Sequence, residues 1–500
     1  MKARIAISRA FAIDKVDPRI YSGFIEHLGR AVYEGIYEPG HPTADKDGFR
    51  QDVIDLVREL DMPLTRYPGG NFVSGYSWTD GIGPKNKRPA RRELAWMALE
   101  PNQVGVNEFV QWCRKANTSP MMAVNLGTGG ADDARNIVEY CNVEKGSHWS
   151  DLRRAHGFEK PHGIKTWCLG NEMDGPWQIG HKNAVDYGKL ARETAKVMKL
   201  TDPSIELVAC GSSSLEMPEF ARWEEQVLTE CFNHVEYISL HSYFGNSEND
   251  TPLFLSKPDR MNEFIRKVAA TCDFVSAKLK SKKRINISFD EWNVWFHSGR
   301  KDKKVPQWIC PRQILEDVYT MEDALVVGGI LISLLNNADR VKIACIAQTV
   351  NVIAPIMTAK GGAAWRQTIF YPFMHASKYG RGTVLRQAVE SPEYRNKDGK
   401  SPYLHSAVVL NEGKKEIAIF AVNRSIDKEL ELSVDLSSFG GTSVAEWIVM
   451  QDRNLKSSNT LKNRDNVVPS VSNDATVKNG ILKASLGKAS WNVIRVKIPG

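Results

Sequence analysis

Short apolar segments alternate with helical patterns from residue 20 to about residue 380. The helical patterns place apolar residues at positions i, i+3, i+4 and i+7, as in residues 53–60. Continuous apolar strands that each precede a helix indicate a parallel sheet covered by helices. The segments predict eight strands, at residues 20–26, 63–66, 121–125, 164–172, 207–212, 235–241, 285–291 and 341–348.

Eight strand and helix units favour a closed (β/α)8 TIM barrel, which we expect to span residues 14–381. An open doubly wound sheet is the alternative fold. It is disfavoured because no GxGxxG turn follows any of the predicted strands.

The apolar period changes to two after about residue 382. Residues 430–436 alternate between apolar and polar, which gives a strand one buried face, and residues 411–413 have the composition of a hairpin turn. This pattern predicts a jelly-roll-like, all-β sandwich over residues 382–500. Residues 1–13 also begin with an alternating segment that no helix follows, so we expect this N-terminal strand to join the sandwich.

The sandwich could serve as a carbohydrate-binding domain or as a structural module. Trp447 and Trp491 lie within its strand patterns and are expected to be buried, which favours the structural role.

The composition is that of an ordinary folded protein, with 42% hydrophobic and 25% charged residues. The net charge of +7 comes partly from basic clusters near residues 280–284 and 300–304, which we interpret as solvated loops. No aromatic interleaving or amphipathic helix accompanies them, so neither a nucleic-acid nor a membrane partner is expected.

The first residues lack the pattern of a signal peptide, and no apolar stretch reaches the ~18 residues of a membrane span. The eight cysteines contain no CxxC pair, which favours free thiols and argues against a zinc site. We therefore expect a cytoplasmic protein without a metal or a cofactor.

Side chains that carry chemistry in such a barrel lie at the carboxyl ends of the strands. These ends carry carboxylates, amides and aromatic rings, which suit the hydroxyls and apolar faces of a sugar. The residues are Glu26, Arg66, Asn71, Asn125, Asn171, Glu172, Ser212, His241, Tyr243, Glu291, Trp295 and Gln348.

Glu172 and Glu291 each end an otherwise uncharged or nearly uncharged strand. A glycosidase needs two carboxyl groups across the scissile bond, about 5–5.5 Å apart for retention of configuration and about 6.5–9.5 Å apart for inversion. The alternative is that either glutamate only pairs with a barrel arginine such as Arg66. Two glutamates together, with Asn171 beside one and Trp295 after the other, favour a glycoside hydrolase.

Three motifs carry a resemblance to a known family: Arg-Tyr-Pro-Gly-Gly-Asn-Phe at 66–72, Trp-Cys-Leu-Gly-Asn-Glu-Met-Asp-Gly-Pro-Trp at 167–177 and Phe-Asp-Glu-Trp-Asn-Val-Trp at 289–295. The chain resembles the α-L-arabinofuranosidases of glycoside hydrolase family 51 over the whole barrel and the β module. Thr349 departs from the pattern, because an aliphatic residue is expected after Gln348; this affects local packing at most.

The resemblance implies a retaining mechanism, with Glu172 as general acid/base and Glu291 as nucleophile. It also implies that Tyr243 orients Glu291 and that Trp295 forms an apolar wall. The residues that would surround the furanose are Glu26, Arg66, Asn71, Trp96, Asn171 and Gln348.

Several of these residues could instead have a purely structural role. Trp96 could be loop packing, Trp295 could pack between domains and His241 could be a structural hydrogen-bonding partner. Asn125 could be a turn residue, and Asp174 is expected to cap its local turn rather than to face Glu172.

The implied activity is the exo-acting release of terminal L-arabinofuranosyl residues from arabino-oligosaccharides, arabinan or arabinoxylan. The resemblance also implies a homo-oligomer, often a hexamer in this family. An endo-glucanase or a β-xylosidase on the same barrel is the first alternative. A non-catalytic carbohydrate-binding protein is the second, and the intact pair Glu172 and Glu291 speaks against it.

Overall fold

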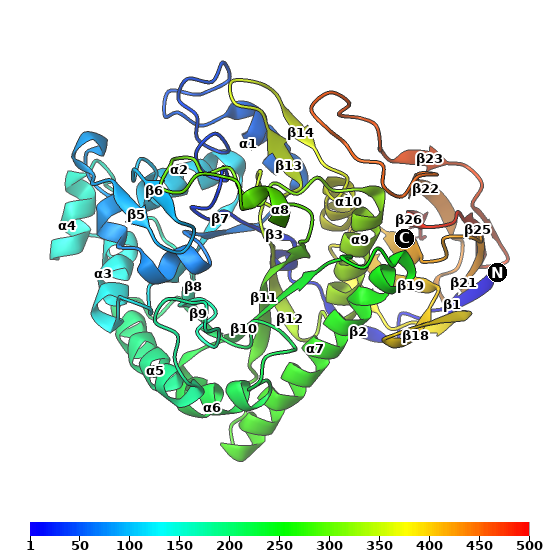
Figure 1. The fold of residues 1–500 in the computed structure, drawn as a ribbon. Helices are drawn as coiled ribbons and strands as arrows, with labels where there is room; N and C mark the ends of the chain where they lie inside the picture. Colours follow the sequence, from blue (N-terminus) through cyan, green and yellow to red (C-terminus); the bar gives the residue numbers. More distant parts are fainter. Residues whose placement is uncertain (500) are drawn as a thin grey trace.

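A closed barrel of parallel strands forms the larger part of the fold (Figure 1). The computed structural model describes residues 1–499. The eight strands run in the order β10-β11-β12-β3-β4-β7-β8-β9 around the barrel. Each overlaps one predicted segment, so the predicted TIM barrel is confirmed. The strands are β3 (Ser22–Phe24), β4 (Leu64–Tyr67), β7 (Ser119–Val124), β8 (Thr166–Leu169), β9 (Glu206–Cys210), β10 (Tyr237–Phe244), β11 (Asn286–Val294) and β12 (Val341–Ile346).

Amphipathic helices cover the outer face of the barrel (Figure 1). The predicted pattern at residues 53–60 is confirmed, because the apolar positions of α1 are buried. The helices are α1 (Gln51–Leu60), α2 (Val106–Ala116), α3 (Ala131–Asn142), α4 (His148–Ala155), α5 (Ala184–Thr201), α6 (Arg222–Cys231), α7 (Thr251–Lys278), α8 (Gly299–Asp302), α9 (Met321–Asn336) and α10 (Phe370–Tyr379).

The first predicted strand is shorter than its apolar segment. A 3-10 helix, Pro18–Tyr21, takes up its beginning, and β3 keeps only three residues. The Asp17 side chain accepts a hydrogen bond from the backbone N–H of Arg19 at 3.0 Å, and Pro18 occupies the first helical position. Both features favour a helical turn over an extended start.

Two sheets form the C-terminal sandwich, one of seven strands in the order β2-β15-β19-β20-β26-β22-β23 and one of five in the order β16-β1-β21-β25-β24. Their facing apolar residues form a separate core. The strands are β1 (Lys2–Ala6), β2 (Ala12–Lys15), β15 (Thr383–Leu385), β16 (Ala388–Glu390), β19 (Leu404–Asn411), β20 (Glu416–Asn423), β21 (Leu430–Asp435), β22 (Ser443–Met450), β23 (Ser470–Ser472), β24 (Thr476–Lys478), β25 (Ile481–Leu486) and β26 (Ser490–Lys497).

The N-terminal strand β1 lies in the five-stranded sheet, parallel to β21 and antiparallel to β16. Figure 1 shows this blue segment beside the orange and red strands of the C-terminal region. The strand β2 crosses the expected boundary between residues 13 and 14 and pairs with β15. The division into residues 1–13, 14–381 and 382–500 stays a prediction.

The buried helix α9 lies between the barrel and the sandwich (Figure 1). A Cβ atom added at Gly328 would lie 2.5 Å from the ring of Trp491, so only glycine permits this close approach. Trp447 and Trp491 are 3% and 0% exposed, which confirms that these rings are buried. No helix within residues 1–499 is both long and apolar enough to cross a membrane.

Three two-stranded sheets are separate from the barrel sheet and the two sandwich sheets. They are β5 (Arg91–Glu93) with β6 (Ala98–Glu100), β13 (Ile356–Thr358) with β14 (Ala364–Arg366), and β17 (Glu393–Asn396) with β18 (Gly399–Pro402). The hairpin of β5 and β6 matters for the site, because its turn carries Trp96.

Candidate active site

Glu291 belongs to β11, at the end of the barrel strands. Its carboxylate accepts a hydrogen bond from Arg66 at 2.9 Å on Oε1 and one from the Tyr243 hydroxyl at 3.0 Å on Oε2. Burial raises the pKa of Glu291, and the nearby cations of His241 and Arg66 oppose that rise. Groups on two other strands therefore fix both oxygens of this carboxylate.

Glu172 lies just beyond β8, in a turn with left-handed backbone. Gly170 has φ 87° and Glu172 itself has φ 43°, a conformation that costs a non-glycine residue free energy. The Oε1 atom of Glu172 lies 2.9 Å from His241 Nδ1, and Oε2 accepts a hydrogen bond from the Trp177 indole at 2.6 Å. The strained turn thus directs this carboxylate toward Glu291 rather than toward solvent.

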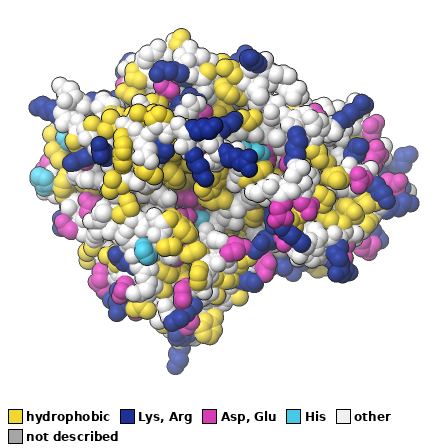
Figure 2. Space-filling view, viewed as in Figure 1, with side chains coloured by type: hydrophobic (Ala, Val, Ile, Leu, Met, Phe, Trp, Pro, Cys, Tyr) yellow, Lys and Arg dark blue, Asp and Glu magenta, His cyan; other side chains and the backbone are white. Residues whose placement is uncertain are grey.

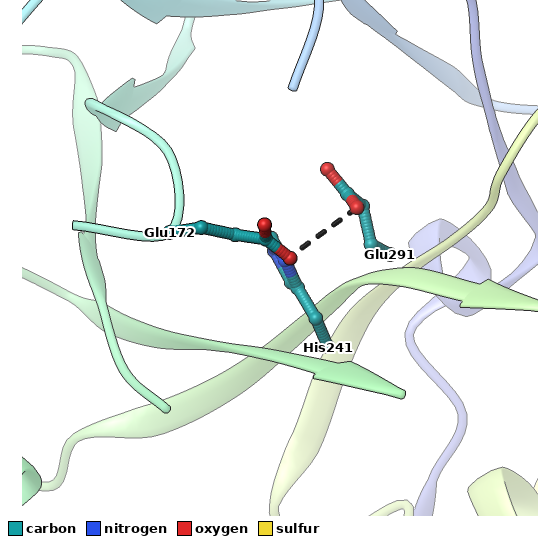
Figure 3. A group of neighbouring side chains, drawn as sticks. All are labelled: Glu172, His241 and Glu291. Carbon is teal, nitrogen blue, oxygen red and sulfur yellow. Dashed lines mark hydrogen bonds and ion pairs between the residues drawn. The ribbon is translucent and has the colours of Figure 1, made fainter. Parts of the chain in front are cut away.

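His241 lies between the two glutamates, as Figure 3 shows. Its Nδ1 atom lies 2.9 Å from Glu172 and 3.5 Å from Glu291, and its Nε2 atom lies 3.1 Å from Asp290. Burial lowers the pKa of His241, but the three carboxylates outweigh burial and raise it to about 10. The imidazole is therefore a buried cation at neutral pH.

One ligand atom from each of Glu172, His241 and Glu291 lies within 4.8 Å of the others, a spacing that could also hold a metal ion. A histidine binds a metal only through a neutral ring nitrogen. The three carboxylates around His241 raise its pKa to about 10, which favours the protonated imidazole in the absence of a metal.

Glu26 is a further buried carboxylate beside the pair of Glu172 and Glu291. It accepts hydrogen bonds from the Trp96 indole at 2.9 Å and from the Gln348 amide at 2.9 Å. Burial and the negative charge of Glu291 raise the pKa of Glu26 to about 7. A Cβ atom added at Gly70 would lie 2.6 Å from Oε1 of Glu291, so the backbone approaches the pair closely at this point.

Figure 2 shows acidic side chains near the middle of one face of the molecule. The site combines oxygens of Glu172 and Glu291 that lie within 4.8 Å of each other, a fixed cation and amide groups. Such an arrangement can protonate one atom of a ligand while a carboxylate attacks a neighbouring atom.

Comparisons with known proteins identify the family of the chain. The α-L-arabinofuranosidase 1 domain matches residues 56–263, and the α-L-arabinofuranosidase C-terminal domain matches residues 290–490. A protein of Bacillus subtilis strain 168, named intracellular exo-α-(1→5)-L-arabinofuranosidase 1, is 58% identical over 99% of both chains. This chain belongs to glycoside hydrolase family 51.

Two solved structures, one of a family 51 enzyme and one of an arabinofuranosidase bound to arabinose, are similar to this chain over its full length. A family 51 α-L-arabinofuranosidase from Bifidobacterium longum has a TM-score of 0.96 at 40% identity and covers 99% of both chains. The arabinose complex of an α-L-arabinofuranosidase from Thermotoga maritima has a TM-score of 0.87 at 31% identity, again over 99% of both chains. The family 51 fold therefore includes the sandwich as well as the barrel.

The structure brings most of the predicted site residues of this family 51 chain into one hydrogen-bonded network. Arg66 joins Glu291 to Asn171, whose Oδ1 atom it contacts at 2.8 Å. Asn71 directly follows Gly70, and its side chain makes no hydrogen bond within residues 1–499. Trp295 is 42% exposed and packs edge-on against Tyr243 at 5.5 Å between ring centroids, so it lies at the rim and is not packed between domains.

Three residues at strand ends serve other purposes in this family 51 chain. The Asn125 side chain accepts hydrogen bonds from the backbone of Gly127 and Thr128 at 2.9 and 3.0 Å, as a turn residue does. The Ser212 backbone N–H donates to Glu224 at 2.7 Å. The expectation that Asp174 caps its own turn is wrong, because its carboxylate binds the backbone N–H and hydroxyl of Ser213 at 2.9 and 3.0 Å.

Thr349, the departure from the family pattern, fills a local space. Its hydroxyl accepts a hydrogen bond from the backbone N–H of Phe24 at 3.0 Å. A Cβ atom added at Gly23 would lie 2.5 Å from this hydroxyl. A threonine in place of the expected aliphatic residue therefore affects only how β3 packs against the segment after β12.

Sequence reasoning missed Asp290 and Trp177. Strict alternation along β11 would direct Asp290 away from the side that Glu291 faces, but the pairing of β11 with β12 shifts register between Phe289 and Trp292. Asp290 is 0% exposed and lies 3.1 Å from His241, which together with Arg66 holds the pKa of Asp290 down at about 2. Trp177 is the last residue of the motif at 167–177, and this position close to Glu172 could have indicated a role in the site.

Proposed function

We propose that this protein is a retaining, exo-acting α-L-arabinofuranosidase. It releases terminal non-reducing L-arabinofuranosyl residues by double displacement, with Glu291 as nucleophile and Glu172 as general acid/base. The observation that carries the proposal is that oxygens of Glu172 and Glu291 lie within 4.8 Å of each other at the mouth of the barrel. Such a close approach of the two carboxylates supports retention, in which the second carboxylate attacks the sugar directly.

In the first step, a Glu291 oxygen forms a bond to the anomeric carbon as the bond from that carbon to the leaving oxygen breaks. Glu172 gives its proton to the leaving oxygen, which departs as a hydroxyl group. Arg66 and Tyr243 keep Glu291 ionised and correctly oriented for the attack.

In the second step, Glu172 takes a proton from water, and the water oxygen attacks the anomeric carbon. The ester bond to Glu291 breaks, and the freed carboxylate returns to its contacts with Arg66 and Tyr243. In the free protein, the charges of Glu291, Asp290 and Glu172 outweigh burial and raise the pKa of His241 to about 10, so the imidazolium offsets the charge of the ionised glutamates.

The furanose ring would be held by the polar network around Glu291. Hydroxyls of the sugar would meet carboxylate, amide and guanidinium groups, and Trp96 and Trp295 would cover its apolar faces. The proposed binding residues are Glu26, Arg66, Asn71, Trp96, Asn171, Tyr243, Trp295 and Gln348.

The name of the Bacillus subtilis relative points to (1→5)-linked arabino-oligosaccharides and to action inside the cell. We extend both properties to this chain, and we propose that it works as a homo-oligomer, most simply a hexamer. Light scattering on the purified protein tests the assembly independently of the activity.

The test is hydrolysis of an aryl α-L-arabinofuranoside, with the first-formed sugar observed by proton NMR. We expect turnover and initial release of the α-anomer, because two inversions at one carbon restore its configuration. Initial release of the β-anomer would exclude double displacement. Turnover of an aryl β-xyloside or a cello-oligosaccharide in place of the arabinofuranoside would assign one of the alternative specificities.

A further inference from the structure

A second cavity lies beside the loop that carries Glu172. It has a volume of about 620 Å³ and lies between the loop after β8, the start of α5 and the start of α6. Its wall is mainly apolar, with polar side chains among the lining residues. The residues that matter here are Trp177, Lys182, Val185, Met217, Trp223 and Gln226.

Trp177 connects this cavity to the catalytic centre. Its indole nitrogen donates to Glu172, while the same ring lines the cavity and is 52% exposed. A general acid protonates the leaving oxygen, so the leaving group must lie beside Glu172. Because Trp177 both contacts Glu172 and lines the cavity, a leaving chain longer than one sugar that passes Trp177 reaches the cavity.

The lining of the cavity suits a sugar. Trp177 and Met217 offer apolar surface for ring faces, and Lys182 and Gln226 carry polar tips that can reach hydroxyl groups.

The geometry points to this cavity as a distal subsite for the leaving chain, which holds a sugar residue beyond the one attached to the scissile oxygen. The assignment deepens the proposed function and rests on it. The ligand class is a linear arabino-oligosaccharide of three or more residues. A substrate that ends at the first leaving-group sugar cannot reach the cavity.

The experiment measures kcat/KM for α-(1→5)-linked arabino-oligosaccharides of two, three, four and five residues, each divided by kcat/KM for an aryl α-L-arabinofuranoside. For the wild type we expect this ratio to rise by about tenfold from the shortest chain to the plateau, the effect of ~1.4 kcal/mol of added binding. The aryl substrate reports the proposed function separately: its turnover can stand while the chain-length effect fails.

Two substitutions at different lining segments fill the cavity, Val185→Trp at the start of α5 and Met217→Trp in the loop before α6. Either variant that folds should flatten the rise to within about twofold, the level of a subsite that contributes no binding. The matched control is Val471→Trp on β23, a residue that is 62% exposed in the sandwich. It should keep the wild-type profile.

A wild-type ratio that does not change with chain length would overturn the assignment. So would a rise that persists in both filled variants, because the chain would then bind elsewhere. If neither filled variant folds, calorimetric titration of Glu172→Gln with arabinobiose and arabinotetraose decides instead. We expect the tetraose to bind about tenfold more tightly, and equal affinities would contradict the subsite.

Discussion

Glu291 and Glu172 lie within reach of each other but are held in different ways. Glu291 sits within the barrel strand β11 and is bound by Arg66 and Tyr243, both from barrel strands. Glu172 sits in a left-handed turn beyond its strand and is bound by His241 and by the half-exposed Trp177. One carboxylate is fixed on the scaffold, and the other faces a loop.

This difference matches the proposed roles. A nucleophile must be ionised and aimed at one carbon, so fixed donors from the barrel suit it. A general acid/base must gain and lose a proton in each cycle, so a position on a loop beside a half-exposed partner suits it better. Substitutions that affect the two glutamates differently test the comparison most directly.

The largest expected effect is a loss of kcat that depends on the leaving group in Glu172→Gln but not in Glu291→Gln. Glu291→Gln should lower kcat by about 10⁴-fold or more for every aryl α-L-arabinofuranoside, because the attacking charge is lost. Glu172→Gln should cost about 10²- to 10⁴-fold with poor leaving groups and much less with a dinitrophenolate, which departs without a proton. Equal losses for both substrates in Glu172→Gln would contradict its role.

The control is Glu393→Gln, on a two-stranded sheet away from the barrel mouth. It should leave kcat unchanged for both leaving groups. A loss in this variant would point to a general effect of the substitution on folding.

Arg66→Lys should have the next largest effect. Lysine keeps the charge but cannot contact Glu291 and Asn171 at once as the guanidinium does, so we expect kcat to fall by about 10²-fold. The matched control is Arg495→Lys, since Arg495 also bridges two acidic residues, Glu416 and Glu446, but does so in the sandwich. Similar losses of kcat in Arg66→Lys and Arg495→Lys would show that the effect is not specific to the barrel site.

Tyr243→Phe should lower kcat by about tenfold, because one hydrogen bond to the Glu291 carboxylate is lost. That bond favours the charged form, so its removal raises the pKa of Glu291. The acidic limb of the kcat/KM profile should then move to higher pH. A profile that keeps its position would show that Tyr243 does not act through Glu291.

A last prediction concerns stability rather than catalysis, through the contribution of His241. Its pKa in the folded protein, about 10, lies above the ordinary value of 6.5, so its contribution is complete below pH ~6.5 and is lost as the pH rises toward 10. The free energy of unfolding should decline by about 1 kcal/mol per pH unit across this window relative to His241→Gln. Parallel stability curves for the two proteins would contradict a buried imidazolium.

The barrel could be predicted from the sequence because its buried parallel strands are continuous apolar segments. The position of Glu291 followed from the end of such a segment. Asp290 could not be predicted, because a register shift between β11 and β12 interrupts the alternation that sequence reasoning assumes.

The loops were harder to place than the strands. Trp96 reaches Glu26 from the hairpin of β5 and β6, and Trp177 reaches Glu172 from the loop after β8. No period in the sequence encodes such contacts, since turns and tertiary hydrogen bonds fix them. Trp96 was assigned through the family resemblance, and the contact of Trp177 became evident from the structure.

The central claim is tested most directly by the stereochemistry of azide rescue in two variants, Glu291→Ala and Glu172→Ala, acting on an activated aryl α-L-arabinofuranoside. In Glu291→Ala, azide replaces the missing nucleophile and should give the β-L-arabinofuranosyl azide. In Glu172→Ala, azide replaces water in the second step and should give the α-azide. The same anomer from both variants, or the α-azide from Glu291→Ala, would contradict the assignment of nucleophile and acid/base.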